Sequence, residues 1–406
     1  MKNGVKVTSM RKLAIVVALF PAFSFAQTQV VKPPIAHYWL SAETAAGMTM
    51  PGMGSMGSMT AGGMMGGQAQ GGRRMLLQLG SQQSASGEPR AAHEIPPGMN
   101  MGPQLPLLTP RREPAQRGGE RATPESMQKP KGRMLIYWGC GEEVRKGQPV
   151  VIDFAKMAEG QTPPGMVSRG VRSPSGPAFG RNRTYGDWPN QEDAKQVPDS
   201  ASLRGDHRIQ GNYSPEIRFS LDRNFLERVE LVANANNLRW KQIPNATGYF
   251  ATLYGAQGEH EVIFWSSSEV QEMGGGLMDY VPPAEVARLI REKVVMPPQT
   301  TECTVPGEVV KKAGSPFLNF IAYGEEANFV HPPRPADPKA AWEQQWAVKV
   351  RFKSTASLLL GEGAEQSRQQ TRQQPGEERK PEQQSQPSAP DPVKEGINVL
   401  RGIFGR

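Results

Sequence analysis

The chain has 406 residues, of which 37% are hydrophobic and 21% charged, and its formal net charge is +8. Its 44 Gly and 37 Pro make up about a fifth of the residues, against roughly 12% in average usage, which predicts many loops and linkers. A bundle of membrane-spanning helices is excluded, because the only long apolar run lies at the N-terminus. A collagen-like or wholly disordered chain is also excluded, because 7 Trp, 14 Phe and 8 Tyr cluster in strand-like segments.

The first 26 residues have the pattern of a secretory signal peptide. Four basic residues precede the short apolar run 13–25, and Ala26 follows it at the expected cleavage site. The run is too short for a stop-transfer helix, so we expect export to the periplasm or the cell envelope. An uncleaved N-terminal anchor is the alternative.

Removing residues 1–26 lowers the charge of the mature chain. The loss of four basic residues leaves 43 basic against 39 acidic residues, a net charge of +4. This excess is too small for a nucleic-acid-binding surface, so no nucleic-acid partner is expected.

Residues 27–222 are predicted to form a β-rich unit with one small sheet. Its strand-like segments lie between long stretches of low complexity, and 133–138 with 148–154 is typical of a hairpin with a long loop. The stretches 47–72 (Met/Gly-rich), 81–130 (Pro-rich) and 158–200 (polar) are expected to be disordered insertions.

Residues 228–355 are predicted to form a second β unit. A strand ending in Trp240 is followed by Pro244 and Ala246 in a turn, and Tyr249 opens the next strand. This pattern resembles the B–C region of fibronectin type III domains, and 317–325 is similar to the F strand of that family. The resemblance implies a β-sandwich whose core contains Trp240, Tyr249, Phe320 and Ala322, with 348–352 as its last strand. An expected helix over 282–293 departs from the family pattern.

The predicted fold class is therefore mainly β, with a tail. The Gln/Pro-rich stretch 356–391 is expected to be a disordered linker leading to an amphipathic helix over 392–406. Val393, Ile397, Leu400 and Phe404 would form one apolar face of this helix. We expect this face to contact an envelope protein or a membrane surface, with docking onto the chain's own sandwich as the alternative.

Cys140 and Cys303 are the only cysteines, one in each predicted unit. In an oxidising compartment such a pair favours a disulfide, which would tie the two units together. The alternative is two unpaired thiols.

A run of methionines forms the most unusual segment of the sequence. Thioether sulfurs suit Cu(I), and their close spacing on a Gly-rich backbone would let several converge on one ion. The run contains no His or Asp, so a plain linker is the competing interpretation. The candidate ligands are Met48, Met50, Met53, Met56, Met59, Met64 and Met65.

No catalytic motif is present in the sequence. A Gly-x-Ser-x-Gly elbow, a phosphate-binding loop, His-Glu-x-x-His and Cys-x-x-Cys are all missing. Glu142, Glu143 and Asp153 could be imagined as paired carboxylates, and 259–261 as an acid–base set, but charged loop residues of this kind usually serve solubility. No catalytic residue and no cofactor is therefore predicted.

The hypothesis that follows is a non-enzymatic, exported cell-envelope protein that binds a partner or acts as an adaptor. The overall layout resembles uncharacterised exported proteins of Gram-negative bacteria, which implies a compartment and no activity. Trp188 and Trp342 are possible contact points in loops, with buried packing as the competing interpretation for each. Periplasmic copper binding through the methionine run is the alternative function.

Overall fold

The computed structural model describes residues 29–47, 71–110, 132–159, 168–258 and 260–361. This part of the chain is mainly β, in four sheets with three α-helices. The strands are β1 (Val31–Lys32), β2 (Ala36–Gly47), β3 (Gly72–Ser81), β4 (Ala91–Glu94), β5 (Gln104–Leu107), β6 (Arg133–Trp138), β7 (Val150–Asp153), β8 (Thr184–Trp188), β9 (Gly205–Gly211), β10 (Ile217–Leu221), β11 (Val232–Asn234), β12 (Asn237–Arg239), β13 (Ala246–Gln257), β14 (Glu261–Ser266), β15 (Glu302–Thr304), β16 (Phe317–His331), β17 (Trp342–Glu343) and β18 (Trp346–Leu359). The helices are α1 (Phe154–Ala158), α2 (Pro283–Arg291) and α3 (Gly307–Ala313), and a 3-10 turn covers Pro97–Met99.

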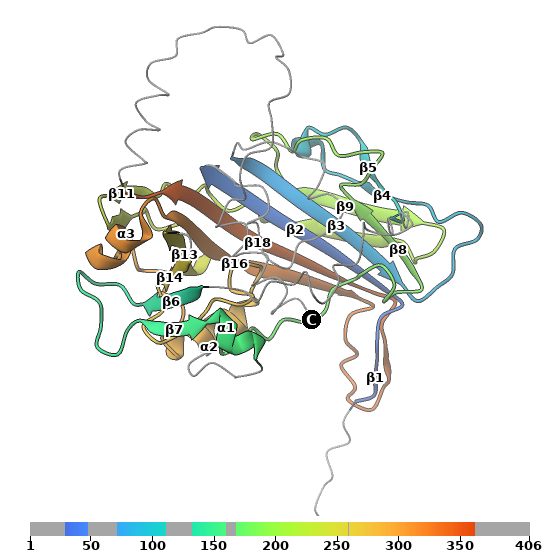
Figure 1. Cartoon of the computed structure of the whole chain (residues 1–406). Coiled ribbons are helices and arrows are strands. Elements are labelled where there is room, and N and C mark those ends of the chain that lie inside the picture. The colour runs from blue at the N-terminus through green and yellow to red at the C-terminus, as the bar shows by residue number, and fades with distance from the viewer. Residues whose placement is uncertain (1–28, 48–70, 111–131, 160–167, 259, 362–406) are drawn as a thin grey trace, which may run out of the picture.

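A nine-stranded sheet is the centre of the molecule, in the order β7-β6-β14-β13-β16-β18-β2-β3-β8. The long strands β16, β18, β2 and β3 cross it side by side (Figure 1). Strands from the two ends of the described chain are interleaved, because β18 pairs in parallel with β2, and β14 pairs in parallel with β6. Most of the other described segments lie on the two faces of this sheet.

The alternation of side chains along β2 defines the two faces. Tyr38, Leu40 and Ala42 point to one side, called face A here, and belong to a large apolar core. Trp39, Ser41 and Glu43 alternate with them and lie on the other side, called face B, which carries many charged groups.

A four-stranded sheet, β10-β9-β4-β5, contributes to the core on one half of face A. Its apolar side chains share one core with those of β2, β3 and β18, and Met99 and Met101 from the loop between β4 and β5 are buried in it. We expected the whole stretch 81–130 to be disordered, and this is wrong for 91–107, which forms β4, the 3-10 turn and β5. The pairing of β4 with β9 across more than 100 residues explains the error, because no local pattern reveals such a partner.

A three-stranded sheet, β11-β12-β15, contributes to the core on the other half of face A together with α3. Trp240 packs against Tyr249 and Phe320, with ring centroids 5.5 and 4.7 Å from its own. All three rings and Ala322 are buried, which confirms the core residues expected from the sequence.

Face B is covered partly by helix and partly by irregular chain. α1 follows β7 directly, and Asp153 caps it by accepting hydrogen bonds from the backbone N–H groups of Ala155 and Lys156. α2 starts at consecutive prolines and packs Val286 and Leu289 against Phe250 and Ile321 of the sheet.

The expected division into two β units does not match the division into sheets. Strands from 27–222 and from 228–355 share the nine-stranded sheet, so the expectation of one small sheet confined to the first range is wrong. The polar stretch 158–200 was expected to be disordered, but 184–188 forms the edge strand β8, whose residues are all buried. The expected hairpin of 133–138 with 148–154 is confirmed by the antiparallel pair β6–β7.

Candidate functional site

A cleft lies on face A, where the two covering sheets approach each other. It has a volume of about 620 Å³, within the size range of ligand-binding clefts, and junctions of this kind are where binding sites are often found. Thr44 and Phe352 contribute from the central sheet, and the segment 222–228, which links the two covering sheets, forms one wall. Thr44 holds this wall in place, since its hydroxyl donates to the carbonyl oxygen of Leu226 at 2.7 Å.

Eight charged side chains line the cleft, four of each sign. The basic residues are Arg73, Arg204, Arg223 and Arg228, and the acidic residues are Asp199, Asp222, Glu227 and Glu325. They come from β3, the loops around β9 and β10, and the bulge of β16, so the fold gathers charges that are far apart in the sequence.

Several of these charges pair with each other. Arg223 forms an ion pair with Glu325, and Arg228 lies 3.5 Å from Asp199. Within the described ranges, neither Arg204 nor Glu227 forms an ion pair. Arg73 also forms no ion pair within these ranges, so the cleft offers two unpaired cations and one unpaired carboxylate to a ligand.

Arg73 is the most constrained cation of the cleft. Its guanidinium lies over the ring of Phe225, 5.0 Å from the centroid, and Nη1 donates to the carbonyl oxygen of Ala201. Burial lowers the pKa of Arg73, the nearby Arg228 lowers it further, and Asp199 opposes both. Two neighbouring guanidinium groups with a single carboxylate between them make this end of the cleft receptive to an anionic group.

A buried chain of hydrogen bonds leads from the central sheet to the loop that carries Arg204 of the cleft. Tyr38 Oη lies 2.8 Å from His93 Nδ1, His93 Nε2 lies 2.9 Å from His207 Nδ1, and His207 Nε2 lies 2.8 Å from the carbonyl oxygen of Leu203. A carbonyl can only accept, so we assign the protons in one direction: Tyr38 donates to His93, His93 to His207, and His207 to Leu203. The chain thus joins the central sheet to the loop that carries Arg204.

The two histidines of this hydrogen-bonded chain, His93 and His207, are neutral in the folded protein. Burial lowers the pKa of His93 well below its ordinary value, and neighbouring His207 lowers it further. Burial also lowers the pKa of His207, against the opposing effects of the Leu203 carbonyl and Asp206. Both side chains are fully inside the core, so we interpret them as structural groups and not as acid–base catalysts.

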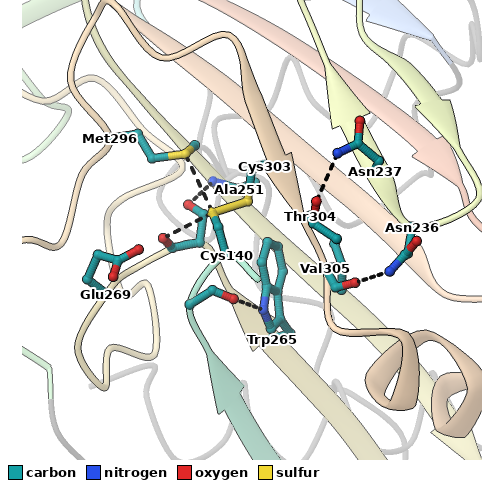
Figure 2. Close-up of a disulfide and its surroundings, with 12 residues drawn as sticks. Cys140, Asn236, Asn237, Ala251, Trp265, Glu269, Met296, Cys303, Thr304 and Val305 are labelled. Carbon is teal, nitrogen blue, oxygen red and sulfur yellow. Dashed lines mark hydrogen bonds between the residues drawn. A yellow bond between two sulfur atoms is a disulfide. The ribbon is translucent and has the colours of Figure 1, made fainter. Parts of the chain in front are cut away.

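Cys140 and Cys303 form the disulfide that was expected from the sequence (Figure 2). Gly139, at a φ of +99°, turns the chain after β6, a conformation that favours glycine, and its carbonyl accepts a hydrogen bond from Trp265 Nε1 at 3.0 Å. Gly141 then donates its N–H to the carbonyl oxygen of Thr304. The disulfide joins the end of β6 to β15, and so ties the central sheet to the three-stranded sheet.

The carboxylates considered for catalysis are not brought together with a histidine. Asp153 caps α1. Glu142 lies in the loop after β6, and its backbone carbonyl accepts a hydrogen bond from the N–H of Gly307 at the start of α3. His207 lies in the four-stranded sheet and is buried, with its ring stacked on that of Phe219. Among the described residues, no group of three or more His, Cys, Asp or Glu side chains is placed to hold a metal ion.

The aromatic contact points expected in loops have different surroundings. Trp188 ends β8 and is buried in the core, which agrees with buried packing and not with a contact point. Trp342 is partly exposed on β17, where Arg334 stacks on its ring. β17 and β1 form a small parallel ribbon that extends away from the rest of the molecule (Figure 1).

Two further sets of predicted contact residues lie outside the described residues. One is the methionine run, Met48, Met50, Met53, Met56, Met59, Met64 and Met65, and the other is Val393, Ile397, Leu400 and Phe404. None of the helices in the described part of the chain combines the length and apolar character needed to cross a bilayer.

The cleft residues were missed by sequence reasoning because they are contributed one or two at a time between positions 44 and 352. The spacing of Arg223 and Arg228 in one short segment was the only local signal. Comparisons with protein-family models, curated proteins and solved structures find no match to this chain.

Proposed function

We propose that this protein is a non-enzymatic, exported cell-envelope protein that binds a partner or acts as an adaptor, and that the cleft on face A holds a charged segment of the partner. The observation that carries the proposal is the cleft itself, about 620 Å³ in volume and lined by four arginines and four acids. Alternating charges of both signs suit a polypeptide segment that carries both signs, because complementary pairs set its register.

Residues 228–355 are best described, on this proposal, as a fibronectin type III-like unit embedded in a larger sheet. In immunoglobulin-type sandwiches the B and E strands lie in one sheet, and the C, F and G strands lie in the other. The order β12-β15 and the order β13-β16-β18 agree with this arrangement. The continuation of the second sheet through β18 into β2 is the main departure.

Export is part of the same proposal. It is supported by the N-terminal pattern of residues 1–26 and by the pairing of Cys140 with Cys303, since disulfides persist mainly in oxidising compartments. The tail ending in 392–406 would provide a second contact, with either the partner or a membrane surface.

A crosslinking experiment in a Gram-negative host tests the cleft. A photoreactive residue replaces Arg204 or Glu227, two cleft charges without an ion pair in the described part of the chain, or, as the control, Lys146, which is exposed in the loop between β6 and β7 and does not line the cleft. We expect one discrete adduct from positions 204 and 227 and none from 146. Equal adducts from all three positions, or none from the cleft, would contradict the proposal.

A charge-swapped pair supplies the matched variant. Asp199→Arg combined with Arg228→Asp keeps an ion pair between the same positions but inverts the polarity of that wall. We expect the adduct to be lost while the protein stays folded. Deleting 392–406 separately reports the role of the tail, and deleting 48–65 with Cu(I) titration reports the copper alternative.

A further inference from the structure

Face B carries a row of charged and aromatic side chains at the centre of the large sheet. In the pairing register, Trp39 lies beside Lys349, Ser41 beside Arg351, and Glu43 beside Lys353. β16 adds Glu326 opposite Arg351. This group lies on the opposite side of the sheet from the cleft and takes no part in the proposed function above.

Arg351 lies between two aromatic rings. Its guanidinium carbon is 4.6 Å from the centroid of Trp39 and 4.4 Å from that of Tyr280. Such stacking holds the planar group in place through cation–π attraction and leaves the N–H donors at its edge free to bind. The backbone of Gly176 packs closely against the ring of Trp39, since a Cβ added at Gly176 would lie only 2.7 Å from that ring.

The other cations of this group have carboxylate partners. Lys349 lies 2.5 Å from Glu326, and Lys353 lies 3.6 Å from Glu43 and 3.7 Å from Asp279. Burial would raise the pKa of Glu43, but Lys353, Thr355 and Arg74 together lower it, so this carboxylate is stabilised in its charged form. The charges of Lys349 and Lys353 are therefore balanced by carboxylates within the group.

Arg351 differs because only one of its nitrogens has a partner. Nε donates to Ser41 Oγ at 2.7 Å, while Nη1 and Nη2 form no hydrogen bond or ion pair with any residue of the described ranges. Burial lowers the pKa of this guanidinium, with Tyr280, Asp279 and Glu326 opposing the effect at longer range. Four N–H donors of this cation therefore have no protein partner among the described residues, and an anion placed against them can accept from them.

We infer that Arg351, between Trp39 and Tyr280, is the anchor of a binding site for the carboxylate group of a small organic acid. The terminal edge of a guanidinium matches a carboxylate with two parallel hydrogen bonds. The ligand is a monoanion and not a phosphate dianion, because Asp279 and Glu326 are close enough to interact with Arg351 and would repel a second negative charge. Trp39 and Tyr280 flank the guanidinium of Arg351.

The test is a titration of the intact protein with acetate, followed through the indole N–H signal of Trp39 in nitrogen-15 NMR spectra. The signal is assigned by its loss in Trp39→Phe. We expect a saturable shift with acetate, and none with chloride or inorganic phosphate at the same ionic strength. No saturable shift with acetate would overturn the proposal, and a larger effect of phosphate would overturn the choice of carboxylate.

Two arginine variants identify the residue responsible. Arg351→Lys keeps the charge but loses the paired donors, and we expect its acetate affinity to fall roughly tenfold or more. Arg334→Lys is the matched control, since Arg334 also stacks on a tryptophan, Trp342, at 5.7 Å, but lies on the exposed ribbon. If both variants bind as the wild type does, Arg351 is only a packing residue. If Arg351→Lys does not fold, the wild-type titration still decides the outcome.

Discussion

The two sheets that contribute to the cores on face A are held in place by different chemistry. The four-stranded sheet is linked to the central sheet by the buried chain from Tyr38 through His93 and His207, which depends on two neutral histidines. The three-stranded sheet is linked by the Cys140–Cys303 disulfide and by rings packed around Trp240. Because of this difference, we expect the attachment of the four-stranded sheet to depend on pH and that of the three-stranded sheet to depend on the disulfide.

This difference bears on the cleft, because the cleft lies where the two sheets approach each other. Arg204 of the cleft follows Leu203, whose carbonyl accepts from His207 in the four-stranded sheet. The N–H of Leu203 also donates to Asn224 Oδ1 at 3.0 Å. The disulfide half contributes Pro244 and Asn245. Low pH is thus expected to change the cleft at Arg204, and reduction of the disulfide is expected to change it at Pro244 and Asn245.

Removing the disulfide should have the largest effect. Cys140→Ser with Cys303→Ser opens a closure of 163 residues, and chain entropy predicts a loss of at most about 5 kcal/mol in the free energy of unfolding. Urea denaturation with and without a thiol reductant measures it. The double variant should not respond to the reductant, whereas Tyr38→Phe should respond as the wild type does. A loss below about 1 kcal/mol would contradict the assigned role of the disulfide.

The histidine pair should produce a pH-dependent loss of stability. Both pKa values are lowered in the folded state, so the unfolded chain takes up protons first, below about pH 6.5. Stability is complete above that pH and decreases as the pH falls, by at most about 2.7 kcal/mol per unit for two protons.

The matched comparison uses His93→Gln with His207→Gln, studied by urea denaturation between pH 8 and 5. The wild-type slope also contains His37, whose pKa burial lowers, so the difference between the two proteins is the quantity to compare. The double variant should have the shallower slope, and the disulfide variant should keep the wild-type slope. Equal slopes for the histidine variant and the wild type would rule out the pair as the pH-dependent element.

Asp187, in β8, should give a pH dependence of stability opposite to that of the histidine pair. Burial raises the pKa of this carboxyl to about 6, although the Tyr185 hydroxyl, 3.0 Å away, opposes the shift. The folded state therefore holds a proton that the unfolded chain has lost, and stability decreases as the pH rises from about 4 through 6. Asp187→Asn should be more stable than the wild type above pH 6, by on the order of 2 kcal/mol, with no gain below pH 4. Thermal or urea unfolding across this range checks it, and a difference that does not vary with pH would refute it.

A matched pair of hydroxyl deletions should have the smallest effects. Tyr38→Phe removes the donor to His93, and Tyr249→Phe removes the hydroxyl that accepts from the Ile243 N–H at 3.0 Å. Each leaves a buried polar atom without its partner, at about 1 to 2 kcal/mol. Only Tyr38→Phe should alter the pH slope of unfolding. If Tyr249→Phe alters it as well, the two halves do not differ in the way described.

Much of the β content could be predicted from the sequence. The strand patterns around Trp240, Tyr249 and Phe320 led to the correct core residues, because burial on one face leaves a two-residue period. The missed strands include β4, β5, β8, β9 and β14. These are short strands in polar or Pro-rich surroundings, and all of them except β5 pair with a strand far along the chain.

The candidate site could not be predicted in the same way. Arg73, Arg204 and Glu325 have no common motif, and each looks like an ordinary surface charge. His93 and His207 lie far apart in the sequence, yet antiparallel pairing of β4 with β9 places them in contact. Arg351 has no local signal of a site, because the loop that carries Tyr280 cannot be placed on β18 from sequence alone.

By itself, the sequence determined what local periodicity and composition can determine: the β class, the aromatic core of residues 228–355, the hairpin of β6 and β7, and a cysteine pair available for bridging. The tertiary structure decided which strands pair, and therefore which polar groups share a site. The parallel pairs β18–β2 and β14–β6 join segments up to about 310 residues apart. Such contacts are selected by burial of complementary faces and not by any local preference of the chain, so the cleft, the histidine chain and the Arg351 site exist only once those strands have paired.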